Sequence, residues 1–445
     1  MRVLTATTLF VCAASTIAAQ TRPLSDSVMA LNRAGKWEQA GQLADRAMRT
    51  APNVEERCAV FVGGLYAAAR LSLIVTGPRQ LTVFDDMCAN TTAVRQSARD
   101  LEEIRRIFTL PPMPTTGVDW SGVDQFWMAV DTLSRDIEPS PAQWRALLIS
   151  PGYRIATISH PTIARAIELA FKPSRRAQRD SVLARLSEDS ATIAHLLAAA
   201  AARDDLKRFR AALAPHVADS IAYAIRNAGR FLPAGATDHA PPLVTFTIFA
   251  SDGYSQEPGV VLDLYHVRET GLADFLSHEF HHHYGSALDR TTYAVNAGDN
   301  RLYQQIRQLK NEGIADMIDK PHPLVEPAGM QWYANMYNAA YEKTPATLKV
   351  LDSLLVAAGT DSAKLFNAGT RAQRLLISGS HPNGAYMART ILETFGRDSL
   401  IATTPSAFAF IRMYEAAEAK RGNASPFSAE GRGALGAIEN RHLKP

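Results

Sequence analysis

The chain has 445 residues, of which 47% are apolar and 20% are charged, and its net charge is +3 when histidine is neutral. This composition is typical of a globular protein with two or three domains and an extensive apolar core. The near balance of charges gives no support for binding to nucleic acid or to an anionic membrane surface.

Residues 1–19 have the pattern of a secretory signal peptide. Arg2 supplies a short positive segment, residues 3–17 are mostly apolar, and small residues lead to a cleavage point near Gln20. No other segment is long and apolar enough to span a bilayer. We therefore expect export to the periplasm or the extracellular space, with no transmembrane segment after cleavage.

Export affects how the cysteines are interpreted. Cys12 lies in the signal peptide, so Cys58 and Cys88 remain as a pair in an oxidising compartment. Two interpretations stay open, a disulfide or two buried free thiols. Neither cysteine has a second Cys or His at metal-ligand spacing, so zinc is not expected there.

Residues 20–110 are expected to form an N-terminal helical region. Small residues and Trp37 between Ala30 and Pro52 follow an order that resembles one tetratricopeptide repeat. Arrays of such repeats need about three units to be stable, and only one unit matches. We expect a helical hairpin, with binding of a protein partner as a weaker alternative. The Pro-rich segment Leu110–Gly117 is the predicted linker.

Residues 118–445 are predicted to be mainly helical with a small β element, which makes the fold class α+β. Leu183–Leu213 is an Ala-rich helical run, in which the lone His195 is expected to be structural. The pattern then changes, because Leu243–Phe249 alternates β-branched and aromatic residues and Val260–Tyr265 is a second apolar run. Two strands are therefore expected, separated by turns at Gly253 and at 258–259.

The next segment, Leu272–Gly285, reads L-A-D-F-L-S-H-E-F-H-H-H-Y-G and contains an H-E-x-x-H motif. In a helix, His278 and His282 lie one turn apart on one face, where both can bind one metal ion, and Glu279 adjoins them. An alternative is a solvated surface with no metal. A half-buried helix is favoured by the apolar stripe on roughly its other side, formed by Leu272, Leu276 and Phe280.

A third ligand is expected on a second helix. Apolar residues from Leu302 to Met317 share one face and predict a helix over 300–320, ended by Pro321. On it, Glu312 completes a His-His-Glu set that leaves the fourth position of zinc open for water. Asp316 is expected to accept a hydrogen bond from the outer nitrogen of a ligating histidine. The alternative is a charged helix edge with no metal nearby.

These motifs resemble the gluzincin superfamily, to which thermolysin belongs. H-E-F-H-H at 278–282 is similar to its first motif, and N-E-G-I-A-D at 311–316 is similar to its downstream E-x-x-x-D helix. More narrowly, the chain from about Trp120 to Ala417 resembles bacterial secreted zinc-dependent peptidases of unknown function, which also carry H-P-x-G-x-Y-M-A, here at 381–388. In thermolysin-like peptidases the last strand before the motif helix is an edge that pairs with extended substrate.

The resemblance implies a gluzincin-like catalytic region that acts as a zinc metallopeptidase on peptide or protein substrates. Zinc lowers the pKa of a bound water to about 7, and Glu279 is expected to act as general base and to pass the proton to the leaving amine. His381 and Tyr386, near the start of a helix that runs to about Phe395, are the candidate donors to the oxyanion. Tyr386 is preferred, because a phenol donates without needing a particular protonation state.

Two other functions stay open. One is a zinc hydrolase that uses the same water chemistry on an amide other than a peptide bond. The other is a binding protein whose helices carry the function and whose zinc site is structural or a relic.

Overall fold

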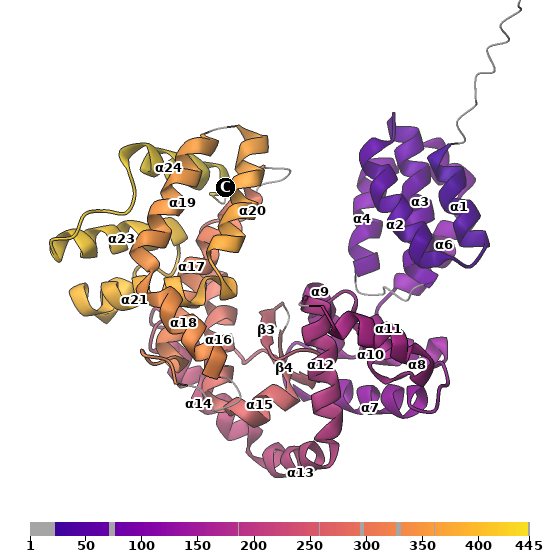
Figure 1. The fold of residues 1–445 in the computed structure, drawn as a ribbon, viewed down its shortest axis with the longest axis horizontal. Coiled ribbons are helices and arrows are strands. Elements are labelled where there is room, and N and C mark those ends of the chain that lie inside the picture. Colours follow the sequence, from indigo (N-terminus) through magenta and orange to yellow (C-terminus); the bar gives the residue numbers. More distant parts are fainter. Residues whose placement is uncertain are drawn as a thin grey trace, which may run out of the picture. The chain divides into compact units, whose positions relative to one another are not determined.

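The protein is described by a computed structural model over residues 23–70, 76–185, 187–257, 259–293, 298–325, 331–359 and 361–443. The chain divides into two compact units, Met1–Leu110 and Pro111–Pro445 (Figure 1). The predicted signal peptide and the Pro258 part of a predicted turn lie outside the described residues. In the described part of the chain, no helix combines the length and the apolar character that crossing a membrane requires.

The first unit is a bundle of helices built around a central helix. Each of the other helices packs against α3. Gly63 of α3 allows α1 to come close, because a Cβ at this position would lie 2.6 Å from Val28 Cγ1. The described helices of this unit are α1 (Leu24–Arg33), α2 (Trp37–Thr50), α3 (Val54–Arg70), α4 (Thr76–Cys88), α5 (Thr92–Gln96) and α6 (Ala98–Phe108).

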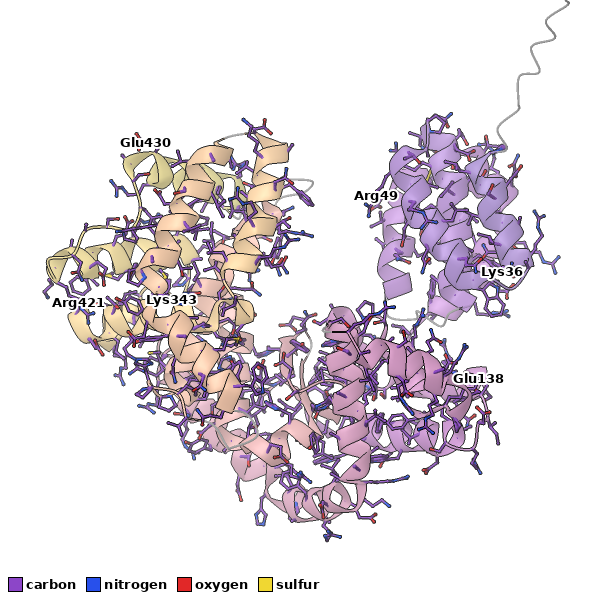
Figure 2. The ribbon with its side chains drawn as sticks, in the orientation of Figure 1. Lys36, Arg49, Glu138, Lys343, Arg421 and Glu430 are labelled. Carbon is purple, nitrogen blue, oxygen red and sulfur yellow. A yellow bond between two sulfur atoms is a disulfide. The ribbon has the colours of Figure 1, made fainter. Side chains whose placement is uncertain are left out.

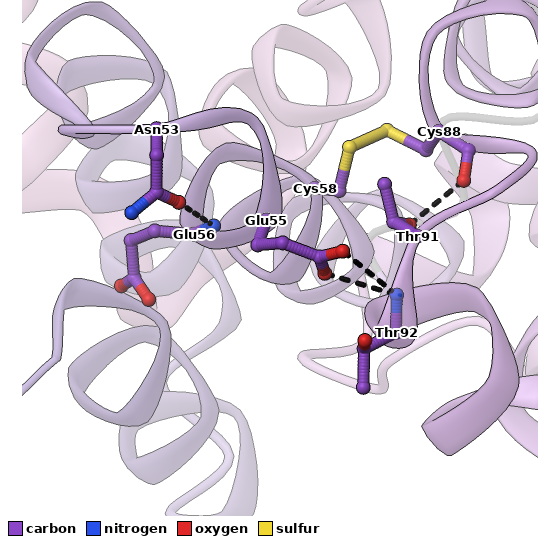
Figure 3. Close-up of a disulfide and its surroundings, with 7 residues drawn as sticks. All are labelled: Asn53, Glu55, Glu56, Cys58, Cys88, Thr91 and Thr92. Atoms are coloured by element: carbon purple, nitrogen blue, oxygen red, sulfur yellow. Dashed lines mark hydrogen bonds between the residues drawn. A yellow bond between two sulfur atoms is a disulfide. The ribbon is translucent and has the colours of Figure 1, made fainter.

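A disulfide between Cys58 and Cys88 joins α3 to the end of α4 (Figure 3). This finding decides between the two interpretations of these cysteines. Beside the disulfide, the carboxylate of Glu55 accepts a hydrogen bond of 2.9 Å from the backbone N–H of Thr92. Thr91 Oγ1 donates to the Cys88 carbonyl at 2.7 Å. The two bonds stabilise the chain where it turns from α4 into α5.

The second unit contains a four-stranded sheet in the order β1-β2-β4-β3. β1, β2 and β4 are parallel, and β3 is antiparallel to β4. Every residue of β2 and β4 is buried, which is typical of strands covered on both faces. The strands are β1 (Val118–Asp119), β2 (Leu243–Thr247), β3 (Gly253–Gln256) and β4 (Gly259–Asp263).

Two expectations about these strands are wrong. Gly253, which was predicted to form a turn, begins the short strand β3. β4, the last strand before the motif helix, pairs with β2 on one side and with β3 on the other, so it is not an edge strand. β3 occupies that edge, and in the described part of the chain it pairs with β4 alone.

Helices form the rest of the second unit. Between β1 and β2 lie α7 (Ser121–Leu133), α8 (Pro141–Ile149), α9 (Pro151–Ser159), α10 (Ile163–Phe171), α11 (Arg176–Leu183), α12 (Glu188–Ala201), α13 (Arg203–Leu213) and α14 (Val217–Gly229). After the sheet come α15 (Leu264–Thr270), α16 (Ala273–Leu288), α17 (Asn300–Asp319), α18 (Gln331–Glu342), α19 (Thr344–Ala358), α20 (Ser362–Leu375), α21 (His381–Phe395), α22 (Arg397–Ile401), α23 (Ala407–Lys420) and α24 (Ala429–His442). Short 3₁₀ turns are η1 (Pro173–Arg175), η2 (Ala214–His216) and η4 (Ser378–Ser380).

His195 connects α12 to the carboxyl end of β4. Its Nε2 atom lies 3.0 Å from Oδ2 of Asp263, a fully buried carboxylate. Asp263 accepts hydrogen bonds from the backbone N–H groups of Phe249 and His266. These contacts give His195 the structural place that we expected. By contrast, the six charged residues labelled in Figure 2 are all exposed to solvent.

Candidate metal centre

Helix α16 carries the H-E-x-x-H motif and is held by its apolar side. Leu276 and Phe280 are fully buried, so the helix is fixed in rotation by the core beneath it. His278 and His282 lie on the adjoining face, and their Nε2 atoms are 3.0 Å apart. Glu279 lies between them in sequence and is also buried. The local sequence therefore presents two imidazoles and a carboxylate at one place.

Helix α17 brings Glu312 to the same point. Its bounds agree with the predicted helix, and Leu302, Ile306 and Leu309 bury its apolar face. Glu312 Oε2 lies 3.0 Å from His282 Nε2 and 3.4 Å from His278 Nε2. The fold therefore brings His282 and Glu312 together, although thirty residues separate them in the sequence.

The three atoms form a donor set that fits zinc. A tetrahedral Zn²⁺ with bonds of about 2.0–2.2 Å separates its ligand atoms by about 3.3–3.6 Å, a range that the adjustment of three side chains by a few tenths of an ångström reaches. The three separations among His278 Nε2, His282 Nε2 and Glu312 Oε2 are 3.0, 3.0 and 3.4 Å. Two imidazoles and one carboxylate are also the ligand types that catalytic zinc sites use, with a further position left for water.

Helix α21 places His381 beside this cluster. α17 and α21 cross at two glycines, where a Cβ on Gly313 would lie 2.4 Å from the Gly384 carbonyl. This crossing brings His381 Nε2 to 3.4 Å from Glu312 Oε2. Glu312 is thus approached by three histidines, one of them from α21.

Tyr386 does not join the cluster. It lies five residues after His381, which is about 140° around the helix, so the two side chains leave α21 in different directions. The Tyr386 ring packs against Tyr341 and Tyr414, with centroids 5.2 and 6.2 Å away. The structure therefore brings His381, and not Tyr386, beside Glu312, and which of the two residues stabilises the oxyanion stays a prediction.

Two carboxylates contact the Nδ1 atoms of His278 and His381. Asp319 Oδ1 lies 3.0 Å from His278 Nδ1, whereas Asp316 Oδ1 lies 3.7 Å from that atom and 2.8 Å from His381 Nδ1. The hydrogen bond that we expected between Asp316 and a histidine of the motif is therefore made by Asp319. Asp316 instead orients His381.

His278, Asp316 and His381 form a second group close enough to bind a metal. Lys320 makes this group a poor cation site, because its Nζ atom lies 2.7 Å from Asp316 Oδ1. A divalent cation at the same oxygen would face an ammonium at short range in a buried place. The electrostatics therefore favour the group that contains His282 and Glu312.

The charges of the cluster shift its pKa values in a consistent way. Burial raises the pKa of Glu312, but His282 and His381 outweigh burial and hold the pKa well below its usual value. Burial and Lys320 lower the pKa of His278, but Asp319 and Glu312 outweigh them and raise it to about 10. Zinc binds neutral imidazole, so the ion must displace this proton when it binds.

Glu279 and His281 respond mainly to burial. Burial raises the pKa of Glu279, although His282 and His278 act against it. For His281, burial together with the two motif histidines lowers the pKa to about 3. The Nε2 atom of His281 lies 3.4 Å from the Phe231 carbonyl, so this side chain contacts the segment that follows α14 and does not face the cluster.

Sequence reasoning missed Asp319, Lys320 and Tyr337. Asp319 could have been found, because it lies seven residues after Glu312 and therefore shares its helical face. Tyr337 donates a hydrogen bond of 2.9 Å to Asp316 Oδ2 from a different helix, α18. No local spacing in the sequence indicates that contact.

Comparisons with known proteins agree with this chemistry. No curated protein and no solved structure matches the chain. A family model with the description "Putative zinc dependent peptidase (DUF5700)" matches residues 144–422, which include all the residues of the cluster. Zn²⁺ is thus the cofactor that both the family and the His and Glu ligand groups indicate. Because the match spans more than half of its residues, the chain belongs to this family of zinc-dependent peptidases.

Proposed function

We propose that this protein is an exported zinc metallopeptidase of the gluzincin type, with His278, His282 and Glu312 as the zinc ligands. The observation that carries the proposal is the convergence of these three side chains from α16 and α17 within 3.4 Å of one another. Membership of a zinc-dependent peptidase family supports it. His-His-Glu is the ligand set of thermolysin. Asp319 supports it from outside the set, because its carboxylate accepts a hydrogen bond from Nδ1 of the ligand His278.

When bound, zinc supplies an activated water at neutral pH and polarises the scissile carbonyl. Glu279 would accept the proton of a water activated in this way and deliver it to the leaving nitrogen, a role that its raised pKa favours. His381 is held at Nδ1 by Asp316, so its Nε2 atom is directed to the cluster. From there a protonated His381 donates a hydrogen bond to the oxygen on which negative charge develops.

The edge strand β3 is the proposed binding place of the substrate backbone. It lies against α16, because a Cβ on Gly253 would be 2.6 Å from the ring of Phe275. Its other side is not paired in the described part of the chain. An extended peptide can add to such an edge through backbone hydrogen bonds, which places its scissile bond near the motif helix.

A digest of a broad peptide library, with and without a chelator, tests the function. We expect cleavage that the chelator abolishes and that added Zn²⁺ restores. Zinc binding without cleavage of any peptide would favour a hydrolase of other amides or a binding protein. Cleavage that persists in chelator would contradict a zinc mechanism.

Glu279→Gln separates catalysis from metal binding. We expect this variant to keep its zinc and to lose about 10²–10⁴-fold in kcat, because it removes the base but no ligand. Asp274→Asn is the matched control, since it changes an exposed carboxylate of the same helix. Hydrolysis retained in Glu279→Gln would remove this residue from its proposed role.

Export is part of the same proposal. The disulfide between Cys58 and Cys88 supports it, because disulfides persist in oxidising compartments. Cell fractionation followed by N-terminal sequencing should find the protein outside the cytoplasm, beginning near Gln20. A cytoplasmic protein that retains Met1 would contradict export.

A further inference from the structure

The partly buried ammonium of Lys320 lies between two carboxylates of the site, those of Asp316 and Asp319. Lys320 Nζ is 2.7 Å from Asp316 Oδ1 and 3.2 Å from Asp319 Oδ2. Only 15% of the Lys320 side chain is exposed. Its pKa is raised well above the usual value, because Asp316 and Asp319 outweigh the effect of burial. Lys320 is therefore charged at neutral pH.

Each carboxylate contacts a different histidine. Asp319 uses its other oxygen for His278 Nδ1 at 3.0 Å, and His278 belongs to the proposed zinc ligands. Asp316 Oδ1 lies 2.8 Å from Nδ1 of His381, the proposed oxyanion donor. The Lys320 ammonium is thus connected through Asp319 to the proposed zinc ligand His278, and through Asp316 to the proposed oxyanion donor His381.

Removing this charge would change the geometry of both histidines. Asp316 and Asp319 are three residues apart on α17, so their side chains lie on one face and repel each other. Buried carboxylates that lose their counter-charge are strongly destabilised and turn toward water or take up protons. Either response would release His278 and His381 from fixed orientations.

A second contact acts on only one of the two carboxylates. Tyr337 donates a hydrogen bond of 2.9 Å to Asp316 Oδ2. The side-chain contacts of Asp319 are instead with Lys320 and His278. Asp316 therefore has three donors, from Lys320, His381 and Tyr337. The Tyr337 contact makes it possible to test the two halves of the network separately.

We propose that Lys320 is a positioning residue that aligns the zinc ligand His278 and the oxyanion donor His381 together, and that Tyr337 aligns His381 alone. This inference rests on the proposed function for the role of His381. Its zinc-binding half does not depend on peptidase activity.

The test compares Lys320→Met, Lys320→Arg and Tyr337→Phe with the wild type. Zinc affinity is measured by competition with a chromogenic chelator on metal-free protein, and kcat and KM are measured on a peptide that the wild type cleaves. Tyr341→Phe is the matched control, because it removes a buried phenol from α18 one turn away from Tyr337. Circular dichroism and Tm establish that each variant is folded at the assay temperature.

Lys320→Met should lose about 10–100-fold in zinc affinity and a similar factor in zinc-saturated kcat, as expected for removal of outer support from metal ligands and catalytic groups. Lys320→Arg should recover most of both, since it keeps the charge. Tyr337→Phe should lower kcat about tenfold and leave zinc affinity unchanged. Tyr341→Phe should change neither quantity.

A folded Lys320→Met protein with wild-type zinc affinity and kcat would overturn the proposal. A Tyr337→Phe protein that loses zinc affinity as much as activity would also overturn the proposal. This second test remains valid even if Lys320→Met does not fold. If the wild type binds zinc but cleaves no peptide, the proposed function fails. The zinc affinity of Lys320→Met then still tests the first half of the inference.

Discussion

Glu312 is the residue at which the three histidines of the cluster meet. Its Oε2 atom lies 3.0 Å from His282 and 3.4 Å from both His278 and His381. This half-buried carboxylate has a pKa well below its usual value, because the imidazoles outweigh the effect of burial and stabilise its charge. The same charge makes it a ligand that is ready for a divalent cation.

Glu312→Ala should weaken zinc affinity more than about 100-fold, because changes to outer partners alone cost 10–100-fold. Chelator competition measures the effect. Asn311→Ala, the neighbouring change on α17, should leave the affinity near that of the wild type. Unchanged metal content in Glu312→Ala would show that another residue is the third ligand.

At the scale of elements, the cluster depends on how closely α17 and α21 approach. The crossing point has no room for a side chain, since a Cβ on Gly384 would lie 2.3 Å from the Leu309 carbonyl. A Cβ on Gly313 would meet Gly384 in the same way. These two glycines therefore set the distance between Glu312 and His381.

Gly384→Ala should push the two helices apart and destabilise the protein by about 1–3 kcal/mol, the usual cost of overpacking. It should also lower kcat, because His381 moves away from Glu312. The control has the opposite sign: Gly433→Ala in α24, where a Cβ meets nothing within 4 Å, should stabilise by about 0.5–1 kcal/mol. Urea denaturation gives both values, and equal effects of the two changes would contradict the packing argument.

A buried ion pair fixes the connection from α16 to α17. Asp289 ends α16 and lies 3.2 Å from Arg307 Nε and 3.4 Å from Lys310 Nζ. Burial raises the pKa of Asp289, but Lys310 and Arg307 outweigh it and lower the pKa below its usual value. A carboxylate with a lowered folded-state pKa adds stability above the unfolded pKa of about 3.9, and this stability is lost as the pH falls through the folded value.

Asp289→Asn should therefore destabilise the protein at pH 7 by about 3–5 kcal/mol, because this carboxylate no longer balances the charge of the buried Lys310. The difference from the wild type should shrink as the pH falls below about 4. Thermal denaturation across this range measures it. Asp398→Asn, at a side chain that is 96% exposed, is the control and should show no such pH dependence. A pH-independent difference for Asp289→Asn would show that its charge is not the cause.

At the scale of the whole molecule, every residue of the cluster belongs to the unit Pro111–Pro445. The disulfide lies in the other unit and closes a loop with a sequence separation of 30. A cross-link over a loop of this length stabilises by about 3–4 kcal/mol, mainly by restricting the unfolded chain.

Changing Cys58 and Cys88 together to serine should therefore lower the stability of the first unit by about that amount. Zinc content and kcat should not change, because no cluster residue lies in this unit. Limited proteolysis measures the stability of the first unit, and elemental analysis measures the zinc content. Loss of zinc from this double variant would contradict the assignment of the site to the second unit alone.

The sequence predicts the elements of the site better than their contacts. The bounds of α17 and the end of α21 follow from helical periodicity and from Pro321 and Gly396, since these signals are local. β3 was missed because it is a four-residue edge strand with polar residues, which resembles a turn. The contacts of Asp316 with Tyr337 and His381 were missed because these residues come from α18 and α21, and only the three-dimensional packing brings these helices to α17.

Anomalous scattering from crystals of the purified protein at the zinc absorption edge tests the central geometry most directly. The account predicts one strong peak per chain, about 2.0–2.2 Å from His278 Nε2, His282 Nε2 and a Glu312 carboxylate oxygen. A zinc-loaded protein with no peak at this place, or with its peak bound by other residues, would contradict it.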